Sequence, residues 1–170
     1  MKLITIETAP YQQKSTLRNL MELYQYDFSE FEPDDVNENG LYEYMFLDHY
    51  WTEDGRYPFF IRVNTNLAGF ALVRELGTTD NDETIYSIAE FFVMKRYRKN
   101  GIGQYIAVEL FNRFQGIWKV AVLESNKPAQ EFWRKIVERY TNNRYQVIRE
   151  EDWDGPIQIF SSATPRETNA

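Results

Sequence analysis

Residues 93–104 decide how this chain folds: Val93-Met94-Lys95-Arg96-Tyr97-Arg98-Lys99-Asn100-Gly101-Ile102-Gly103-Gln104. The run that leads into them, residues 84–94, is apolar on both faces, as a central strand of a sheet is. From Ile102 onward apolar residues recur every four positions, which predicts a helix. A strand that enters a helix through glycines leaves backbone N–H groups unpaired at the positive end of the helix dipole. The stretch therefore predicts a site for phosphate oxygens, and Arg98 and Lys99 add full charges beside it.

Two familiar phosphate-binding loops do not fit this turn. A Walker A loop would need Gly-Lys followed by Ser or Thr. A dinucleotide-binding fingerprint that begins at Gly101 would need a small residue where Ile106 stands. What remains is Arg-x-x-Gly-x-Gly at the end of a strand, over residues 98–103.

The composition is that of an ordinary globular domain, with 170 residues of which 43% are hydrophobic and 26% are charged. The chain has no cysteine and a single histidine, His49, which excludes thiol nucleophiles, iron–sulfur clusters and multi-histidine metal sites. The net charge of −7 argues against a general nucleic-acid binder. No apolar run is long enough to span a membrane, and residues 1–7 reach a carboxylate too early for a signal peptide. We therefore expect one cytoplasmic domain over residues 1–170, which contacts neither nucleic acid nor membrane and holds no metal ion.

Hydrophobic periodicity and turn residues predict a mixed α/β domain. We expect helices over residues 16–28 and 41–50, after Gly101 and from Pro128, the last one capped by Ser125 or Asn126. Strands are expected over residues 3–6, 58–63, 67–74, 84–94, 118–123, 145–148 and 156–160, with a tight hairpin at residues 64–66 and a turn at Asn39-Gly40.

Three motifs in this order carry a resemblance to a known family. They are Glu90-Phe91-Phe92-Val93 in the central strand, Arg98-Lys99-Asn100-Gly101-Ile102-Gly103 in the turn, and Asn126-x-x-Ala129-x-x-Phe132-Trp133 at the last helix. Together they resemble the GNAT superfamily of N-acetyltransferases. The resemblance implies a mixed, mostly antiparallel sheet of about seven strands with helices on both faces. It also implies acetyl coenzyme A (acetyl-CoA) as the acyl donor.

The resemblance further implies which residues hold acetyl-CoA. In the family the fourth and fifth strands, here residues 84–94 and 118–123, splay apart to admit the donor. The pantetheine arm would pair with the backbone of Phe92, Val93 and Met94. The pyrophosphate would bind the turn made by Arg98, Lys99, Asn100, Gly101, Ile102, Gly103 and Gln104. Asn126 and Phe132 fall where the family lines the thiol end of the arm, although simple core packing explains Phe132 equally well.

Glu90 is the candidate general base. Acetyl transfer needs an uncharged amine, but a lysine-like ammonium has a pKa of about 10.4 and has to lose a proton before it attacks. Glu90 interrupts an apolar strand and shares a face with Ile88 and Phe92, so burial is expected to raise its pKa toward neutrality. In the family a carboxylate at this position often acts as the base, directly or through water; the alternative is a structural carboxylate bonded to backbone or to an arginine. A backbone N–H near Phe92 or Val93 is expected to stabilise the carbonyl oxygen as it gains charge.

The general acid is left open by these residues. Many family members carry tyrosine after the phenylalanine of the last motif, to protonate the departing thiolate. This chain has Trp133 there, whose indole N–H is no useful acid. Tyr97, Tyr105 and Tyr140 are present, and nothing in the sequence selects among them. His49 is a second candidate base, although a lone surface histidine more often has no role.

Residues 27–54 form an acidic, aromatic segment. They include no Lys or Arg and ten carboxylates: Asp27, Glu30, Glu32, Asp34, Asp35, Glu38, Glu43, Asp48, Glu53 and Asp54. Carboxylates beside Tyr42, Tyr44, Tyr50 and Trp51 favour a positively charged ligand, while a solvated acidic face explains the charge equally well. We expect the acceptor to be the primary amine of a cationic small molecule, such as a polyamine or an amino sugar, or of a lysine side chain.

Two other functions fit the same residues. A non-catalytic acyl-CoA sensor or partner-binding module on the same fold would account for Trp133, and an acidic mimic of nucleic acid would account for residues 27–54. The sequence leaves open the identity of the acceptor, the use of other acyl groups and the oligomeric state, a homodimer included.

Overall fold

The computed structural model describes residues 2–163, which form two compact units. The first unit contains the described residues up to Arg74 together with Ile88–Ile106. The second contains Glu75–Ser87 and the described residues from Ala107 onward. A single domain over the whole chain stays a prediction.

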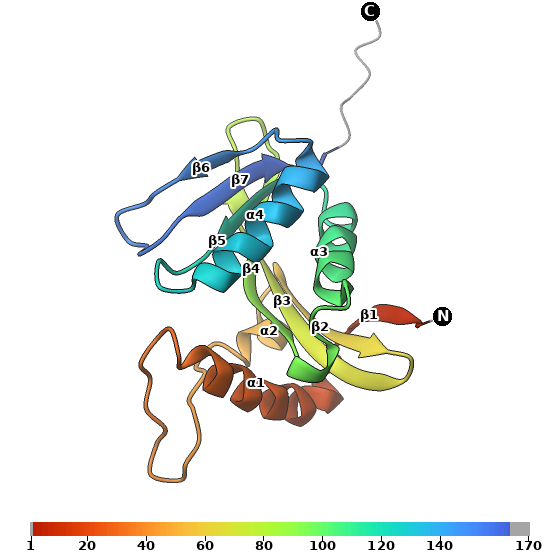
Figure 1. Cartoon of the computed structure of the whole chain (residues 1–170), viewed down its shortest axis with the longest axis vertical. Helices are drawn as coiled ribbons and strands as arrows, with labels where there is room; N and C mark the ends of the chain where they lie inside the picture. The colour runs from red at the N-terminus through yellow and green to blue at the C-terminus, as the bar shows by residue number, and fades with distance from the viewer. Residues whose placement is uncertain (1, 164–170) are drawn as a thin grey trace, which may run out of the picture. The chain divides into compact units, whose positions relative to one another are not determined.

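Strands and helices follow one another along the described residues in the order that the periodicity predicts (Figure 1). The strands are β1 (Ile4–Thr8), β2 (Arg56–Val63), β3 (Asn66–Thr78), β4 (Thr84–Val93), β5 (Ile117–Ala121), β6 (Gln146–Ile148) and β7 (Ile157–Ser161). The helices are α1 (Lys14–Phe28), α2 (His49–Thr52), α3 (Ile102–Arg113) and α4 (Lys127–Thr141), with short 3-10 helices η1 (Tyr11–Gln13) and η2 (Lys95–Tyr97). The strands are hydrogen-bonded in the order β1-β2-β3-β4-β5-β7-β6. The predicted mixed, mostly antiparallel sheet is confirmed.

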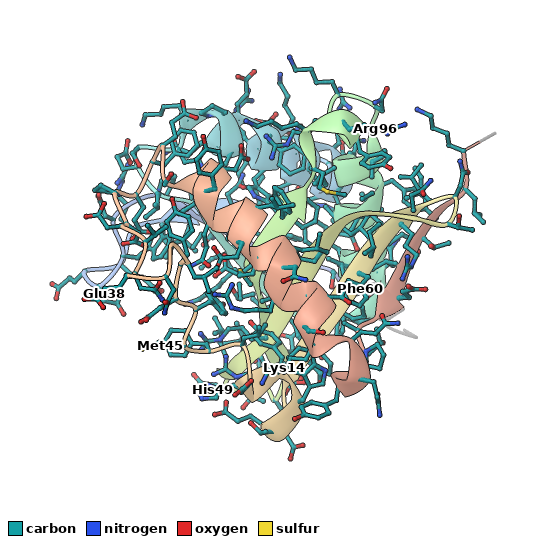
Figure 2. The ribbon with its side chains drawn as sticks, turned by 90° about the horizontal axis from the view of Figure 1, so that it is seen from below. Lys14, Glu38, Met45, His49, Phe60 and Arg96 are labelled. Atoms are coloured by element: carbon teal, nitrogen blue, oxygen red, sulfur yellow. The ribbon has the colours of Figure 1, made fainter. Side chains whose placement is uncertain are left out.

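In the first unit, α1 packs on one face of the strands, as Figure 2 shows. Leu17, Leu20 and Met21 stand at helical spacing on α1 and are buried in one cluster with strand residues. The strand residues of this cluster are Phe60, Phe70, Leu72 and Phe92. Their sequence neighbours Phe59, Ile61, Ala71 and Val73 point to the opposite face and are buried as well. Both faces of these strands are therefore apolar.

Gly69 lets β3 approach β4 closely. A Cβ atom at Gly69 would lie 1.9 Å from the backbone oxygen of Phe92. Beside it, the Met94 N–H donates to the Ala68 carbonyl oxygen at 2.8 Å. Because successive residues of a strand direct their backbone groups to alternate edges, Phe92 and Met94 face β3. The backbone of Val93 faces the other edge of β4.

In the second unit, β4 and β5 pair in parallel, and the register joins Ile85 to Ile117 and Ser87 to Lys119. β5 and β6 both pair antiparallel with β7. α4 is capped by Asn126, whose side-chain oxygen accepts a hydrogen bond from the Ala129 N–H at 3.1 Å. Of the two residues predicted to cap this helix, Asn126 is the one that does so.

The segment between α1 and α2 differs from the prediction of a helix over residues 41–50. Within residues 29–52 the structure has an α-helix at His49–Thr52, and residues 29–48 form a loop with turns. The predicted turn at Asn39-Gly40 is present, with Gly40 at φ 73°. The Asn37 side-chain oxygen accepts the backbone N–H groups of Asn39 and Leu41. Such local side-chain bonds compete with the helix ladder.

Candidate active site

Glu90 lies on the face of β4 that packs against α1. The Tyr24 hydroxyl of α1 donates to Glu90 Oε2 at 2.5 Å. The Tyr44 hydroxyl, from the loop over residues 29–48, donates to Glu90 Oε1 at 3.1 Å. Ile88 and Phe92 are buried on the same face, as the period-two alternation predicts. Each carboxylate oxygen of Glu90 thus accepts one phenol hydrogen bond.

The surroundings of Glu90 bring its pKa close to neutral pH. Burial raises the pKa of Glu90 from 4.5 to about 7. The hydrogen bonds from Tyr24 and Tyr44 act in the opposite direction, and the nearby charge of Glu32 adds to the rise. A carboxylate has about four lone-pair sites, so two phenols leave room for a further donor. Glu90 is therefore able to take up and release a proton near pH 7.

The tyrosines around Glu90 stay protonated. Burial, followed by the negative charge of Glu90, raises the pKa of Tyr24 and Tyr44 well above the ordinary value of 10. The same two causes raise the pKa of Tyr50, on α2, to about 12. Phenols with such high pKa values donate hydrogen bonds but are poor acids. Tyr24 and Tyr44 therefore hold the Glu90 carboxylate rather than exchange protons with it.

Tyr24 is a site residue that the sequence alone does not select. Its helical spacing from Leu17, Leu20 and Met21 predicts an apolar core position. One chemical rule could have identified Tyr24 as a site residue, namely that a buried phenol needs a hydrogen-bond partner. Glu90 is the carboxylate on the strand face beneath this helix. Tyr44 stands in the segment expected to hold a cation, but its hydroxyl is bonded to Glu90.

The turn between β4 and α3 presents backbone N–H groups at a helix N-terminus. Lys99 and Gly101 both have left-handed backbone, with φ of 62° and 75°. The Tyr105 N–H donates to the Gly101 carbonyl oxygen at 3.0 Å, which starts the helical ladder of α3. Alternating left-handed residues curl successive N–H groups into a concave nest that suits anions. Apart from Gly101 itself and its two chain neighbours, no residue of the described chain has an atom within 4 Å of the place where a Cβ of Gly101 would stand.

The guanidinium group of Arg98 contacts other groups of the protein. Its guanidinium pairs with Asp27 in the last turn of α1, and its Nε donates to the Val93 carbonyl oxygen at 2.6 Å. Lys95 Nζ lies 3.3 Å from the other carboxylate oxygen of Asp27. Partial burial raises the pKa of Asp27, but the hydrogen bonds from Arg98 and Lys95 outweigh it and hold that pKa below 3.8. Arg98, predicted to add its charge to the phosphate site, thus shares the Asp27 carboxylate with Lys95.

Asn126 and Phe132 belong to the second unit. Asn126 is 8% exposed, and its side chain caps α4. Phe132 is partly exposed and lies edge-to-face with Trp133, with ring centroids 5.0 Å apart. Trp133 itself is buried near Phe111, with centroids 6.4 Å apart. Core packing therefore accounts for tryptophan at this position.

Several residues of the acidic segment 27–54 make structural contacts. The Trp51 indole N–H donates to the Ala9 carbonyl oxygen at 2.9 Å, and Tyr50 is buried. His49, the second candidate base, lies with Nδ1 3.4 Å from Glu53 Oε1 and takes no part in the hydrogen bonds to Glu90.

Basic side chains from outside the acidic segment 27–54 form ion pairs with some of its carboxylates. Lys14 pairs with Asp48, and Arg56 pairs with Glu53 at 2.8 Å. The carboxylates of the segment without an ion pair in the described part of the chain are Glu30, Glu32, Asp34, Asp35, Glu38, Glu43 and Asp54. Figure 2 looks onto α1, with the loop that carries Glu38 and Met45 beside it. A net negative surface therefore remains on this loop.

Metal-binding and membrane-spanning features are absent from the described residues. Among residues 2–163, no group of three His, Asp or Glu side chains is placed to hold a metal ion. None of the helices described there combines the length and apolar character that crossing a membrane requires.

Comparisons with known proteins identify a family and a shared fold. A model of the acetyltransferase (GNAT) family matches residues 17–137. No curated protein sequence matches the chain significantly. Among solved structures, an acetyltransferase from Thermus thermophilus has a TM-score of 0.66 at 12% identity, over 93% of this chain and 96% of that one.

Two further structures carry informative ligands. An aminoglycoside acetyltransferase from an uncultured soil metagenomic sample, in complex with sisomicin, has a TM-score of 0.62 at 16% identity, over 86% of this chain and 93% of that one. Arabidopsis thaliana NAA60, in complex with a bisubstrate analogue, has a TM-score of 0.58 at 16% identity, over 93% of this chain and 96% of that one. At these identities the likeness shows the shared fold.

Proposed function

This chain belongs to the acetyltransferase (GNAT) family, and we propose that it transfers the acetyl group of acetyl-CoA to the primary amine of a cationic acceptor, with Glu90 as the general base. The proposal rests on the hydrogen bonds and the pKa of Glu90. Its carboxylate is held by two phenols and has a pKa of about 7. A base of that strength is matched to removing an ammonium proton at neutral pH.

The turn over residues 98–104 supports acetyl-CoA as the donor. The left-handed residues Lys99 and Gly101 and the N-terminus of α3 suit a diphosphate, and the open space at Gly101 allows phosphate oxygens to approach the backbone. Bound acetyl-CoA would supply a thioester carbonyl for attack. We assign the Val93 N–H as the donor to that carbonyl oxygen, because the backbone of Phe92 and of Met94 faces β3.

The reaction needs little from the protein besides orientation and one base. Glu90 would take a proton from the acceptor ammonium, directly or through one water, and the neutral nitrogen would then attack the thioester carbon. The C–N bond forms, the C–S bond breaks, and coenzyme A leaves as a thiolate. Because a thiol has an ordinary pKa of about 8.5, this leaving group needs no protein acid, and Trp133 is compatible with turnover.

The acidic loop supports a cationic acceptor. The carboxylates without an ion pair in the described residues, such as Glu32 and Asp34, raise the local concentration of cations. An attraction of this kind between exposed charges weakens as salt is added. We therefore expect polyamines, amino sugars or lysine side chains to be better acceptors than neutral or anionic amines.

A panel of amines tests this function, with thiol release from acetyl-CoA as the readout. We expect cationic acceptors to react fastest and their KM to rise with salt. Amino acids that outperform every polycation without salt dependence would contradict the cationic acceptor. Binding of acetyl-CoA without turnover of any amine would favour the alternative, a non-catalytic acyl-CoA sensor.

The donor site has a separate test by calorimetry. We expect Gly103→Glu to abolish acetyl-CoA binding, because a bulky acid at the start of α3 blocks and repels the phosphates. Unchanged affinity in a folded variant would show that the pyrophosphate binds elsewhere.

A further inference from the structure

Two charged residues of α1 bind the backbone of one loop residue from both sides. Arg18 Nη2 donates to the Tyr42 carbonyl oxygen, and Glu22 Oε2 accepts the Tyr42 N–H at 3.0 Å. Arg18 and Glu22 lie one helical turn apart and also pair with each other, at 2.5 Å. One turn further along, Gln25 Nε2 donates to the Glu43 carbonyl oxygen at 3.2 Å. One stripe of α1 therefore holds two consecutive residues of the loop.

This attachment determines where Tyr44 lies. Residues 41–44 belong to no helix or strand, so their place depends on bonds to other parts of the first unit. Two residues after Tyr42, the Tyr44 hydroxyl reaches Glu90 at 3.1 Å, and the Tyr44 ring packs against the core cluster that contains Phe92. The attached residues of the loop thus lead directly to Tyr44, whose hydroxyl bonds to the carboxyl group of the proposed base.

We propose that residues 41–44 form a cover over Glu90, that Arg18 and Glu22 hold this cover on α1, and that the attached cover limits the access of water to the Glu90 carboxyl group. The inference rests on the proposed function, because it matters for catalysis if Glu90 is the base. Arg18 and Glu22 are then positioning residues, since they act through Tyr44 and Glu90.

The groups that face Glu90 come from three elements besides its own strand. They are Tyr24 of α1, Tyr44 and Glu32 of the loop, and Tyr50 of α2, beyond which Arg56 and Arg74 act on Tyr50. The loop contributes to Glu90 in three ways: it adds burial, a hydrogen-bond donor and a negative charge. Burial and the charge of Glu32 raise the pKa of Glu90, and the donor Tyr44 lowers it, with burial the largest cause.

Two substitutions should therefore move the pKa of Glu90 in opposite directions. Tyr44→Phe removes the donor and keeps the cover, so the pKa should rise above 7. Glu22→Ala releases Tyr42, admits water and should lower the pKa from about 7 toward the ordinary 4.5. As a matched control, Glu38→Ala removes the same charge from an exposed residue of the loop and should leave the pKa unchanged.

The experiment is a pH titration of the Glu90 side-chain carboxyl carbon by ¹³C NMR on the full chain, with the signal assigned by its loss in Glu90→Gln. This readout needs no substrate, so it is independent of whether Glu90 proves to be the base. A fall with Glu22→Ala and a rise with Tyr44→Phe are the expected results. An unchanged or raised pKa in a folded Glu22→Ala protein would overturn the proposal.

Hydrogen exchange in the wild-type protein gives a second test that needs no variant. The Tyr42 amide, bonded to Glu22, should exchange more slowly than the amides of exposed loop residues such as Glu38. Exchange of the Tyr42 amide at the rate of an open loop would also overturn the proposal. If the pKa shifts are as expected but Glu90→Gln keeps full activity, the cover stands and the proposed function of Glu90 fails.

Discussion

Removal of the Tyr24 hydroxyl should make Glu90 a base that works only at higher pH. Tyr24→Phe deletes the donor that lies 2.5 Å from Glu90 Oε2. The aromatic ring stays packed against Phe70 and Phe92, whose centroids lie 5.7 and 5.8 Å from that of Tyr24. The substitution therefore tests the hydrogen bond with the hydrophobic packing retained.

The magnitude follows from the strength of the lost bond. A hydrogen bond to a charged group contributes about 1.5–3 kcal/mol, and one pKa unit corresponds to ~1.36 kcal/mol. The pKa of Glu90 should rise by about one to two units from its value near 7. At pH 7 the deprotonated fraction of Glu90 would then fall about 5- to 50-fold, and the rate of acetyl transfer would fall with it.

The assay is kcat/KM for the best acceptor, measured from pH 6 to pH 10 and expressed as the ratio of variant to wild type. The ratio cancels the titration of the amine itself, and it should rise toward one at high pH. Tyr26→Phe is the matched control, because Tyr26 lies on the same helix and is 70% exposed. A Tyr24→Phe ratio that is constant across this range would refute the reasoning.

Three further substitutions have defined outcomes. The pKa of Glu90 is higher in the folded protein than its ordinary 4.5, so the stability that protonated Glu90 contributes is present below pH 4.5 and is lost as pH rises through about 7. Glu90→Gln should therefore stabilise the fold by about 3 kcal/mol at pH 8 and by little at pH 4. Urea unfolding at the two pH values would measure this difference. Asp27→Asn should tighten acetyl-CoA binding several-fold in calorimetry, because it removes a carboxylate and releases Arg98 beside the glycine turn; weaker binding would mean that Asp27 orders the turn instead. Gly69→Ala should cost on the order of 3 kcal/mol or more in urea unfolding, since its Cβ would collide with the Phe92 carbonyl oxygen, and a loss below 1 kcal/mol would contradict that contact.

Local signals predicted the elements that surround the site. The run over residues 84–94 and the glycines after it predicted the strand, turn and helix, and the period of two predicted that Glu90 shares a face with Phe92. The hairpin at residues 64–66 follows from Asn64, which adopts φ 57° where asparagine is tolerated. Each of these features depends on residues close together in the sequence.

The contacts of the candidate site depend on residues far apart in the sequence. Tyr24 lies 66 residues from Glu90, and Asp27 lies 71 residues from Arg98. The helix predicted over residues 41–50 fails for a related reason, because Tyr42 bonds to side chains of α1 instead of to a helical ladder. The spacing of these residues can be read from a single sequence. The tertiary contacts that override the local preference for a helix cannot.

The pH dependence of acetyl-CoA-dependent amine acetylation, in the wild type and in Glu90→Gln, addresses the role of Glu90 itself. Glutamine keeps the shape of the side chain and removes its basicity. Wild-type kcat/KM should rise with a midpoint near pH 7, as Glu90 loses its proton. The variant should bind acetyl-CoA normally, lose most of its turnover at neutral pH and recover part of it at pH 9, where more of the amine is uncharged in solution. Equal rates for the two proteins from pH 6.5 to pH 9 would contradict Glu90 as the base.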